Sequence, residues 1–592
     1  MKALACMLLL AVFGCEPATL RASGDPPEPI SPVKGPDQLG VPDAPPTDAP
    51  ARPGPDGEPP APATPPAVLT VTAPPRGARV LGNTLRVQGT VEGGTAPQVT
   101  VAGQPATLGA DRAFTVDVPV SDGLAVIVTE MVDGATRSAD HRAAMINADQ
   151  DPATPVPSAA DVGISAAGFQ VISQLASGFA AGADLGGLVG GNGQVRRLTY
   201  GRIDLQLRPG QDALELELSI YDLYIEIETS FRIIFEIDVR GSMRANPARI
   251  TARIRLVPDG NGSMSLQVEG ARADLQNFSY NINNVPGEVE DWFEGTVRDT
   301  AEDLLADTLN DLVVPNLFDP AALNQELDLL GKKVDLAMAI DQVRIDPSAM
   351  HLALSASATP QISVYPGKAA RPVGGVDAPV DPAHMDIALA ADFVNRILHA
   401  VWAAGALDLE LGGEGGEGPD LGVPLTAGLL AGALGAAGQG ISPAAPLLIR
   451  TRALLAPYCT LQPGERPLRI TMGDFLLELA TANESIVTLA VHLDVDVGLE
   501  ADETGQLQPQ IELVQHVDVA ETPRGPVNEP ALEGLIGGII SQLPTLLAQG
   551  LAADPAADPM PAAPTGLINQ RFVAAGVFLH ILGDIDPNPP AP

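Results

Sequence analysis

The strongest constraint on the fold is an order of periodic segments that occurs twice between about residue 159 and residue 585. In each half, a segment with apolar residues at i, i+3 and i+4 spacing is followed by long segments in which apolar and polar residues alternate. A second segment of helical spacing and a last alternating segment complete the half. Because alternation gives a sheet one apolar side and helical spacing gives a helix one apolar stripe, each half predicts a one-sided sheet packed on helices.

The first half begins with a helical stripe and continues with several alternating segments. The stripe consists of Gly168, Val171, Ile172, Leu175 and Phe179. Alternating segments follow at 213–220, 231–240, 250–256 and 265–275, and strands return at 334–355. Before that return, a second helix is expected to begin near Pro286, with an apolar side made of Val289, Trp292, Phe293, Val297, Leu304 and Leu312.

The second half repeats this order. A helical run is expected over 385–405, with Phe393, Ile397 and Val401 on one face. Residues 493–499 alternate as a strand does, and a last strand is expected around 577–585. The second helix of this half begins near Asn528, with a broad stripe made of Leu532, Leu535, Ile536, Ile539, Ile540, Leu543 and Leu546.

Short alternating segments such as 85–91 and 114–118, separated by glycine-rich turns, predict a small β-sandwich over 67–147. Residues 148–158 are expected to be a linker. The whole chain is therefore expected to be an α+β protein. We refer to 67–147 as the sandwich, and expect it to precede two elongated modules, a first module at 159–370 and a second module at 371–592, each with a curved antiparallel sheet wrapped on a long helix.

The N-terminus has the order of a signal peptide. A lysine at position 2 is followed by an apolar run over 3–13 and then by Gly14 and Cys15. Residues 10–15 resemble a bacterial lipobox, so we expect residues 1–14 to be removed and Cys15 to receive a lipid. The alternative is an ordinary secretory signal that is cleaved nearby. In lipoproteins of this kind an aspartate after the cysteine favours the inner membrane, so Glu16 favours the outer membrane of the cell envelope.

Residues 15–66 are rich in proline, alanine, glycine and acidic residues and contain almost nothing large and apolar. Such a segment cannot offset its own ordering entropy, so we expect a disordered tether. The formal net charge of −39 excludes a nucleic-acid partner, because the field of the chain repels phosphate. Removal of the signal and lipidation of Cys15 would leave Cys459 as the one free thiol of three cysteines, which predicts an inert, buried residue and no disulfide.

Motifs of catalysis are missing from the sequence. It contains no Gly-X-Ser-X-Gly, no His-Glu-X-X-His and no paired cysteine motif. The seven histidines are far apart in sequence, and His399 on a helix is expected to be a boundary residue instead of a ligand. We therefore expect no enzymatic activity, no cofactor and no metal site.

Two segments carry a resemblance to a known family. Residues 162–169, and residues 385–395 with the aromatic-X-Asn step at Phe393 and Asn395, resemble the bactericidal/permeability-increasing protein family of tubular lipid-binding proteins over about residues 159–585. The sandwich resembles immunoglobulin-like spacer modules of bacterial exported proteins. The family wraps a curved sheet around a long helix and holds acyl chains in the groove between them. The chain departs from the family because it has no disulfide and only five lysines, so endotoxin neutralisation is not carried over.

The resemblance implies a membrane-anchored lipoprotein that binds, transfers or senses phospholipid or another hydrophobic ligand in apolar grooves. The candidate groove residues are Val171, Leu175, Phe179, Trp292 and Phe293 in the first module, and Phe393, Ile397, Val401, Leu535, Ile539 and Leu543 in the second. The alternative is a structural or interaction scaffold of the cell envelope with filled cores and no ligand. Closed cores are the simpler interpretation if alanine, glycine and proline only reflect a GC-rich genome.

Overall fold

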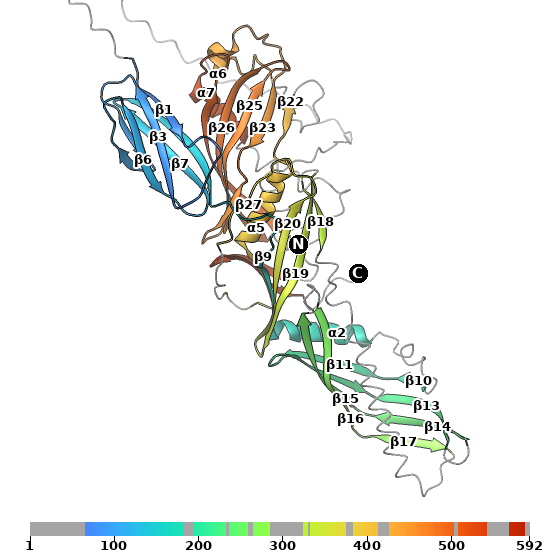
Figure 1. The fold of residues 1–592 in the computed structure, drawn as a ribbon. Coiled ribbons are helices and arrows are strands. Elements are labelled where there is room, and N and C mark those ends of the chain that lie inside the picture. Colours follow the sequence, from blue (N-terminus) through green and yellow to red (C-terminus); the bar gives the residue numbers. More distant parts are fainter. Residues whose placement is uncertain are drawn as a thin grey trace, which may run out of the picture.

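The computed structural model describes residues 65–181, 195–232, 236–258, 264–283, 324–329, 332–373, 380, 383–412, 426–501, 507–540 and 567–586. Figure 1 shows an elongated molecule with the sandwich and the large sheet of the second module at one end. A sheet built from both modules lies in the middle, and the sheets of the first module lie at the other end. The signal peptide, Cys15 and nearly all of the expected tether lie outside the described residues.

The predicted α+β class is wrong, because the described part of the chain is mostly strand and its helices are short. The helices are α2 (Ala166–Ala181), α5 (Ala391–Ala403), α6 (Ala431–Leu434) and α7 (Glu529–Ile540), with a 3₁₀ turn η3 (Gly435–Gly438). The longest has 16 residues, and no long helix wrapped by a sheet is found in the described ranges. The helix expected near Pro286 lies outside them.

The helix predicted over 385–405 is shorter than expected for a clear physical reason. The helical run expected over 385–405 begins instead with strand β21 (Met385–Ala390), and only the following residues form α5. The backbone of β21 pairs on both sides, with β9 (Val156–Ser165) and with β29 (Phe578–Ile585). Tertiary pairing therefore overrides the helical spacing of this segment. Strand β9 itself begins at Val156, within the expected linker.

The sandwich consists of two sheets that share one apolar core. Its strands are β1 (Val68–Ala73), β2 (Ala78–Val80), β3 (Thr84–Glu92), β4 (Gln98–Val101), β5 (Gln104–Ala106), β6 (Ala113–Pro119), β7 (Gly123–Asp133) and β8 (Thr136–Ile146). One sheet has the order β1-β3-β6 and the other β2-β8-β7-β4-β5. In β3 every second side chain is buried, as the alternating pattern predicts.

The central sheet joins the two modules and has the order β18-β19-β20-β9-β21-β29-β28. The strands not yet named are β18 (Gln325–Leu329), β19 (Lys332–Asp346), β20 (Ala349–Pro360) and β28 (Leu567–Ala575). The repeat predicted from the sequence is visible here, because β9 leads into α2 just as β21 leads into α5. The strands β9 and β21 pair antiparallel, and each has a late strand of its own module, β20 or β29, on its other side.

The remaining strands of the first module form two four-stranded sheets, ordered β11-β12-β15-β16 and β10-β13-β14-β17. They are β10 (Val195–Thr199), β11 (Arg202–Pro209), β12 (Leu214–Tyr221), β13 (Leu223–Arg232), β14 (Glu236–Ala245), β15 (Ala248–Pro258), β16 (Met264–Leu275) and β17 (Ser279–Asn283).

The second module has one large sheet, ordered β22-β23-β25-β26-β27, with β24 paired to β25. Its strands are β22 (Glu410–Gly412), β23 (Leu448–Ala453), β24 (Tyr458–Leu461), β25 (Leu468–Ala480), β26 (Ser485–Ala501) and β27 (Leu507–Glu521). The predicted helix near Asn528 is confirmed as α7.

Candidate functional site

The candidate site is one side of the sheet β11-β12-β15-β16 in the first module, which is apolar. Antiparallel pairing of β12 with β15 places Leu216 opposite Ala252 and Leu218 opposite Ile250. Directly opposed residues point to the same side of a sheet, so these side chains form one apolar surface. We call it the inner face; its members on these two strands are Leu214, Leu216, Leu218, Ile220, Ala248, Ile250, Ala252 and Ile254. All of them are buried.

The opposite side of the same sheet is polar. Arg249 lies 3.1 Å from Glu217, and Arg255 lies 3.4 Å from Glu269, with all four side chains more than a third exposed. This side of the sheet is therefore a solvated face. Exposed pairs of this kind add little stability, so the sheet depends on its inner face.

The inner face receives few side chains from helices. In the described part of the chain, the only helical members of its apolar cluster are Phe169 and Ile172 of α2. The apolar cluster of the second module differs, because α5, α6 and α7 all contribute buried side chains to it. Within the described residues, the two modules therefore repeat the order of their elements but differ in the helical side chains that cover their sheets.

Two serines of helix α2 hydrogen-bond to the sheet. The Ser173 hydroxyl accepts from the backbone N–H of Leu207 at 2.8 Å, and the Ser177 hydroxyl accepts from that of Leu205 at 2.8 Å. Both partners lie on β11, the edge strand of its sheet. The two serines, one helical turn apart, thus satisfy backbone groups that an edge strand would otherwise leave without a partner.

The candidate groove residues of the first module are only partly described. Val171 and Leu175 are half-buried, whereas Phe169 is 3% exposed and packs on the inner face. Phe179 lies on α2, but its side chain is outside the description, and Trp292 and Phe293 lie outside the described residues altogether. Of α2, the structure therefore brings Phe169 and Ile172 to the inner face instead of Val171 and Leu175.

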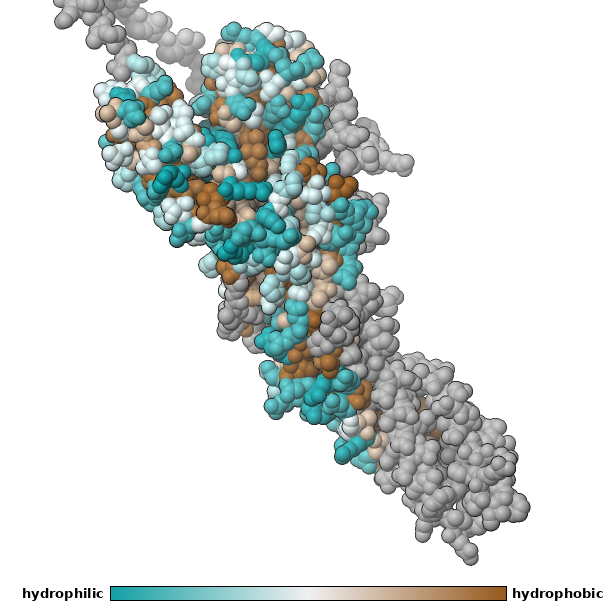
Figure 2. Space-filling view, in the orientation of Figure 1, coloured by the Kyte–Doolittle hydropathy of each residue, from teal (hydrophilic) through white to brown (hydrophobic). Residues whose placement is uncertain are grey.

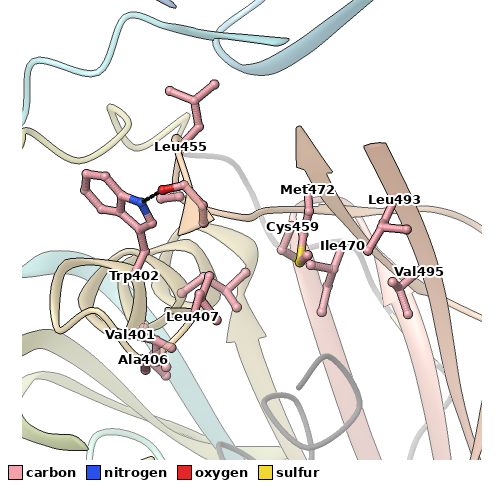
Figure 3. Close-up of a cluster of buried hydrophobic side chains, with 14 of the residues drawn as sticks. Val401, Trp402, Ala406, Leu407, Leu455, Cys459, Ile470, Met472, Leu493 and Val495 are labelled. Carbon is pink, nitrogen blue, oxygen red and sulfur yellow. Dashed lines mark hydrogen bonds between the residues drawn. The ribbon is translucent and has the colours of Figure 1, made fainter. Parts of the chain in front are cut away.

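The candidate groove residues of the second module lie in a packed core. Phe393, Ile397 and Val401 are 2%, 5% and 0% exposed. Figure 3 shows Val401 and Trp402 of α5 together with buried apolar side chains of β24, β25 and β26, among them Cys459, which belong to the same core cluster. The Trp402 indole N–H donates to the carbonyl of Ala453 at 2.8 Å and fixes the helix in place. A ligand could occupy this region only if these side chains moved apart.

Two other residues of that list lie on α7. Leu535 and Ile539 belong to the helix, but their side chains are outside the description, and Leu543 lies beyond the described residues.

Cys459 is 1% exposed, and burial raises the pKa of its thiol, as expected for an inert cysteine. His399 is not the predicted boundary residue: it is 4% exposed, and burial, with the charges of Arg396 and Arg79, lowers its pKa to about 4.

A polar junction, which sequence reasoning missed, connects the sandwich to the second module. Asp474 of β25 is fully buried and accepts from the Arg76 guanidinium at 2.8 Å, from the Gly77 N–H at 2.8 Å and from the Ala143 N–H at 3.0 Å. Asp518 of β27 accepts from the backbone N–H of His141 at 2.8 Å. These partners are more than 300 residues apart in sequence, so no local pattern could have indicated them.

Glycines allow the backbones to approach closely at this junction. A Cβ on Gly473 would lie 2.3 Å from Cβ of Ala143, one on Gly77 would lie 2.7 Å from Leu454, and one on Gly123 would lie 2.5 Å from the Tyr458 ring. None of these positions has room for a side chain. The sandwich is therefore docked on the sheet of the second module (Figure 1) and is not held by its linker alone.

The two copies of the repeat share an aspartate and histidine pair. Asp161 of β9 lies 2.8 Å from Nδ1 of His351 on β20, and Asp386 of β21 lies 3.0 Å from Nδ1 of His580 on β29. Each aspartate is the fifth residue before its helix begins, at Ala166 or Ala391. The hydrogen bond that the His351 ring donates to Asp161 raises the pKa of His351. Burial opposes ionisation of Asp161, but the hydrogen bond and the charges of His351 and Arg344 outweigh it, so its pKa is lowered.

The described residues contain neither a membrane-spanning helix nor a cluster of metal-binding side chains. No helix among them is long and apolar enough to cross a bilayer. No group of three or more histidine, cysteine, aspartate or glutamate side chains in the described ranges is arranged to hold a metal ion. Figure 2 shows that hydrophilic residues cover most of the sandwich and of the second module on that side, with hydrophobic residues in separate patches.

Comparisons with known proteins give weak likenesses. No family model and no curated protein matches the sequence. A solved lipopolysaccharide binding protein aligns at a TM-score of 0.38 and 12% identity, covering 73% of this chain and 99% of that chain. P47 of Clostridium botulinum E1 and P47 from Clostridium botulinum A2 each align at a TM-score of 0.26, with 10% and 9% identity over 73% of this chain. Likenesses this distant decide neither fold nor function, and the resemblance to the permeability-increasing protein family stays a prediction.

Proposed function

We propose that the chain is a membrane-anchored lipoprotein that binds a lipid or another hydrophobic ligand on the inner face of its first module. One observation carries the proposal. The inner face is a continuous apolar surface across β12 and β15, and in the described part of the chain only Phe169 and Ile172 reach it from a helix. A sheet side of this kind offers apolar area to a ligand, whereas a face filled by bulky helical side chains does not.

The chemistry of the inner face sets the class of ligand. On β12 and β15 it contains leucine, isoleucine and alanine and no polar side chain, so it offers no directional partner to a headgroup. An alkyl chain needs none, and each buried CH₂ contributes about 0.8 kcal/mol. The proposed ligand therefore has at least one long aliphatic portion that lies along the strands. A binding function of this kind needs no catalytic group.

A scaffold without a ligand is the second candidate, and the second module favours it. Phe393, Ile397 and Val401 are at most 5% exposed, and Trp402 is held by a hydrogen bond within the same core. Side chains of α5, α6 and α7 fill this core, so an acyl chain would have to displace them. We therefore assign ligand binding to the first module and a structural function to the second, which also carries the docked sandwich.

Anchoring is the other part of the proposal. We propose that Cys15 carries the lipid anchor, that residues 15–66 act as a tether and that the protein belongs to the outer membrane of a bacterial envelope. The support is the residue order before Cys15 and the composition after it. Several acyl chains on one cysteine give stable membrane attachment without a spanning helix.

A tryptophan scan of β15 tests the ligand site. Ala252 is buried on the inner face, and its neighbour Thr251 is exposed on the opposite face of the same strand. If the inner face binds lipid, Ala252→Trp will reduce the co-purified or added lipid severalfold with little change in melting temperature. Thr251→Trp, the matched control, will change neither.

A filled core gives the opposite result for Ala252→Trp. Overpacking then costs about 1–3 kcal/mol of folding stability. A lower melting temperature with unchanged lipid content would therefore reject the inner face as the site and favour the scaffold.

A further inference from the structure

The junction between the sandwich and the second module gathers more titratable groups than docking alone requires. The rings of His141 and His516 stack with centroids 4.6 Å apart, and the His492 ring lies 5.7 Å from His141. Nδ1 of His141 lies 3.0 Å from Asp518. Nε2 of His492 lies 3.6 Å from Asp518 and 3.7 Å from Asp474, too far for a hydrogen bond.

Charges on the two sides of the junction are complementary. The charged and titratable groups of the sandwich are Arg76 before β2, with Asp140, His141 and Arg142 on β8. Those of the second module are Asp474 on β25, His492 on β26, His516 and Asp518 on β27, and Glu533 on α7. With neutral histidines the sandwich side carries a net single positive charge, because Asp140 pairs with Arg142, and the other side carries three carboxylates. Protons added to the second module therefore weaken the attraction.

His492 is the histidine that docking holds neutral. It is 3% exposed, and its Nδ1 accepts from the Asp474 N–H at 3.4 Å, which places the proton on Nε2. The sandwich side chains Arg76 and His141 add positive charge beside it. A second proton on this ring would place a cation in a closed space that already holds the Arg76 guanidinium.

We propose that the docked sandwich is a latch that acid releases, with His492 of the second module as the group that senses the proton. In this account the latch is closed at neutral pH. Protonation of His492 opens it and uncovers the face of β25 and β27 that the sandwich occupies. The inference is independent of the ligand proposed for the first module, because it rests on the junction alone.

The titration of His492 and His141 sets the pH range in which the latch opens. Burial, together with the charges of Arg76 and His141, lowers the pKa of His492 to about 4 despite the two aspartates. Its contribution to docking is thus present above the ordinary pKa of about 6.5 and is lost as the pH falls towards 4. Burial also opposes protonation of His141, but the hydrogen bond and charge of Asp518 outweigh it, and its pKa is raised. His141 therefore favours docking in acid, which opposes the effect of His492.

The expected effect follows from these shifts. If His492 regains an ordinary pKa when the sandwich leaves, the opening equilibrium rises about 30-fold between pH 7.5 and pH 5 from this residue alone. His141 offsets part of this rise, so we expect a severalfold net increase. The N–H groups of Ala143 and His141 report on opening, because they donate to Asp474 and Asp518 across the junction.

Hydrogen–deuterium exchange of the full chain at pH 7.5 and pH 5, corrected for intrinsic exchange rates, tests the latch. We expect protection at residues 141–143 to fall severalfold in acid in the wild type. In His492→Gln, where only His141 still responds, protection should stay the same or rise in acid. The matched control His384→Gln changes a histidine away from the junction, near Asp584, and should respond as the wild type does.

Equal protection of the wild type at both pH values would overturn the latch, and this comparison needs no variant. A loss of protection in His492→Gln as large as in the wild type would overturn the assignment of the sensor. Increased protection of the wild type in acid would show that His141 outweighs His492, which also contradicts the proposal.

Discussion

Asp474 shows how much a single buried side chain can contribute to the arrangement of domains. It is fully buried, and three donors of the sandwich meet its carboxylate. Asp474→Asn keeps the shape and tolerates the positive φ of this residue, but it removes the carboxylate charge that lies 2.8 Å from the Arg76 guanidinium. We expect a loss of about 2–5 kcal/mol in the free energy of unfolding, measured by denaturant titration.

Asp117→Asn is the matched control for that measurement. Asp117 pairs with Arg86 at 2.8 Å on the surface of the same sandwich, with both side chains at least half exposed. Surface pairs contribute about 0–1 kcal/mol, so this variant should be nearly as stable as the wild type. Equal losses in the two variants would contradict the importance given to the junction.

The pair of Asp161 and His351 predicts a pH dependence of stability. His351 has a raised pKa, so its contribution is complete below about 6.5 and is lost as the pH rises through the raised value. Asp161 has a lowered pKa, so its contribution is present above about 4 and is lost in stronger acid. Asp161→Asn should therefore lower the melting temperature more at pH 5.5 than at pH 9, where the 3.1 Å contact with Arg344 remains. The same decrease at both pH values would argue against a charged pair.

At the scale of elements, α2 depends on its two serines. Replacing both Ser173 and Ser177 with alanine leaves the backbone N–H groups of Leu205 and Leu207 without acceptors. Each group without a partner costs about 1–3 kcal/mol when buried. We expect the double variant to unfold at lower denaturant concentration, with faster amide exchange along β11. Gln174→Ala, on the exposed side of the same helix, should have neither effect.

Sequence patterns predict these elements unequally. Alternation predicts β12 and β26, and helical spacing predicts α2 and α7, because each element reflects its own burial period. Met385–Ala390 was expected to be helical because its apolar spacing fits a helix as well, and pairing with β9 and β29 decides for a strand. The expected long helices led to the wrong fold class, since the described helices end after 16 residues or fewer.

Residues of the candidate site were predicted least well. The spacing of α2 indicates an apolar stripe, but the serines that contact β11 look like ordinary helix residues in the sequence. The junction of Asp474, Asp518 and the histidines depends on contacts across more than 300 residues. No periodicity carries such information, because it arises only when the domains dock.

The whole molecule is elongated (Figure 1), and we expect it to be anchored to the membrane and to bind its ligand at one end. Cys15→Ser should release the protein from the membrane into the soluble fraction, and radiolabelled fatty acid should appear on the wild type alone. Retention of the variant at the membrane, with no label on the wild type, would contradict acylation. Cys459→Ser is the matched control, because this cysteine is buried in the second module and should not affect anchoring.

The central claim is that the inner face of the first module binds a hydrophobic ligand. Solvent extraction of gently purified protein lacking residues 1–15, followed by mass spectrometry, tests it most directly. Removal of these residues ensures that the acyl chains of the anchor do not contribute. We expect about one lipid per chain in the wild type. This lipid should be lost in Ala252→Trp and retained in Thr251→Trp. Protein that folds and contains no extractable lipid, and takes none from added phospholipid, would contradict it.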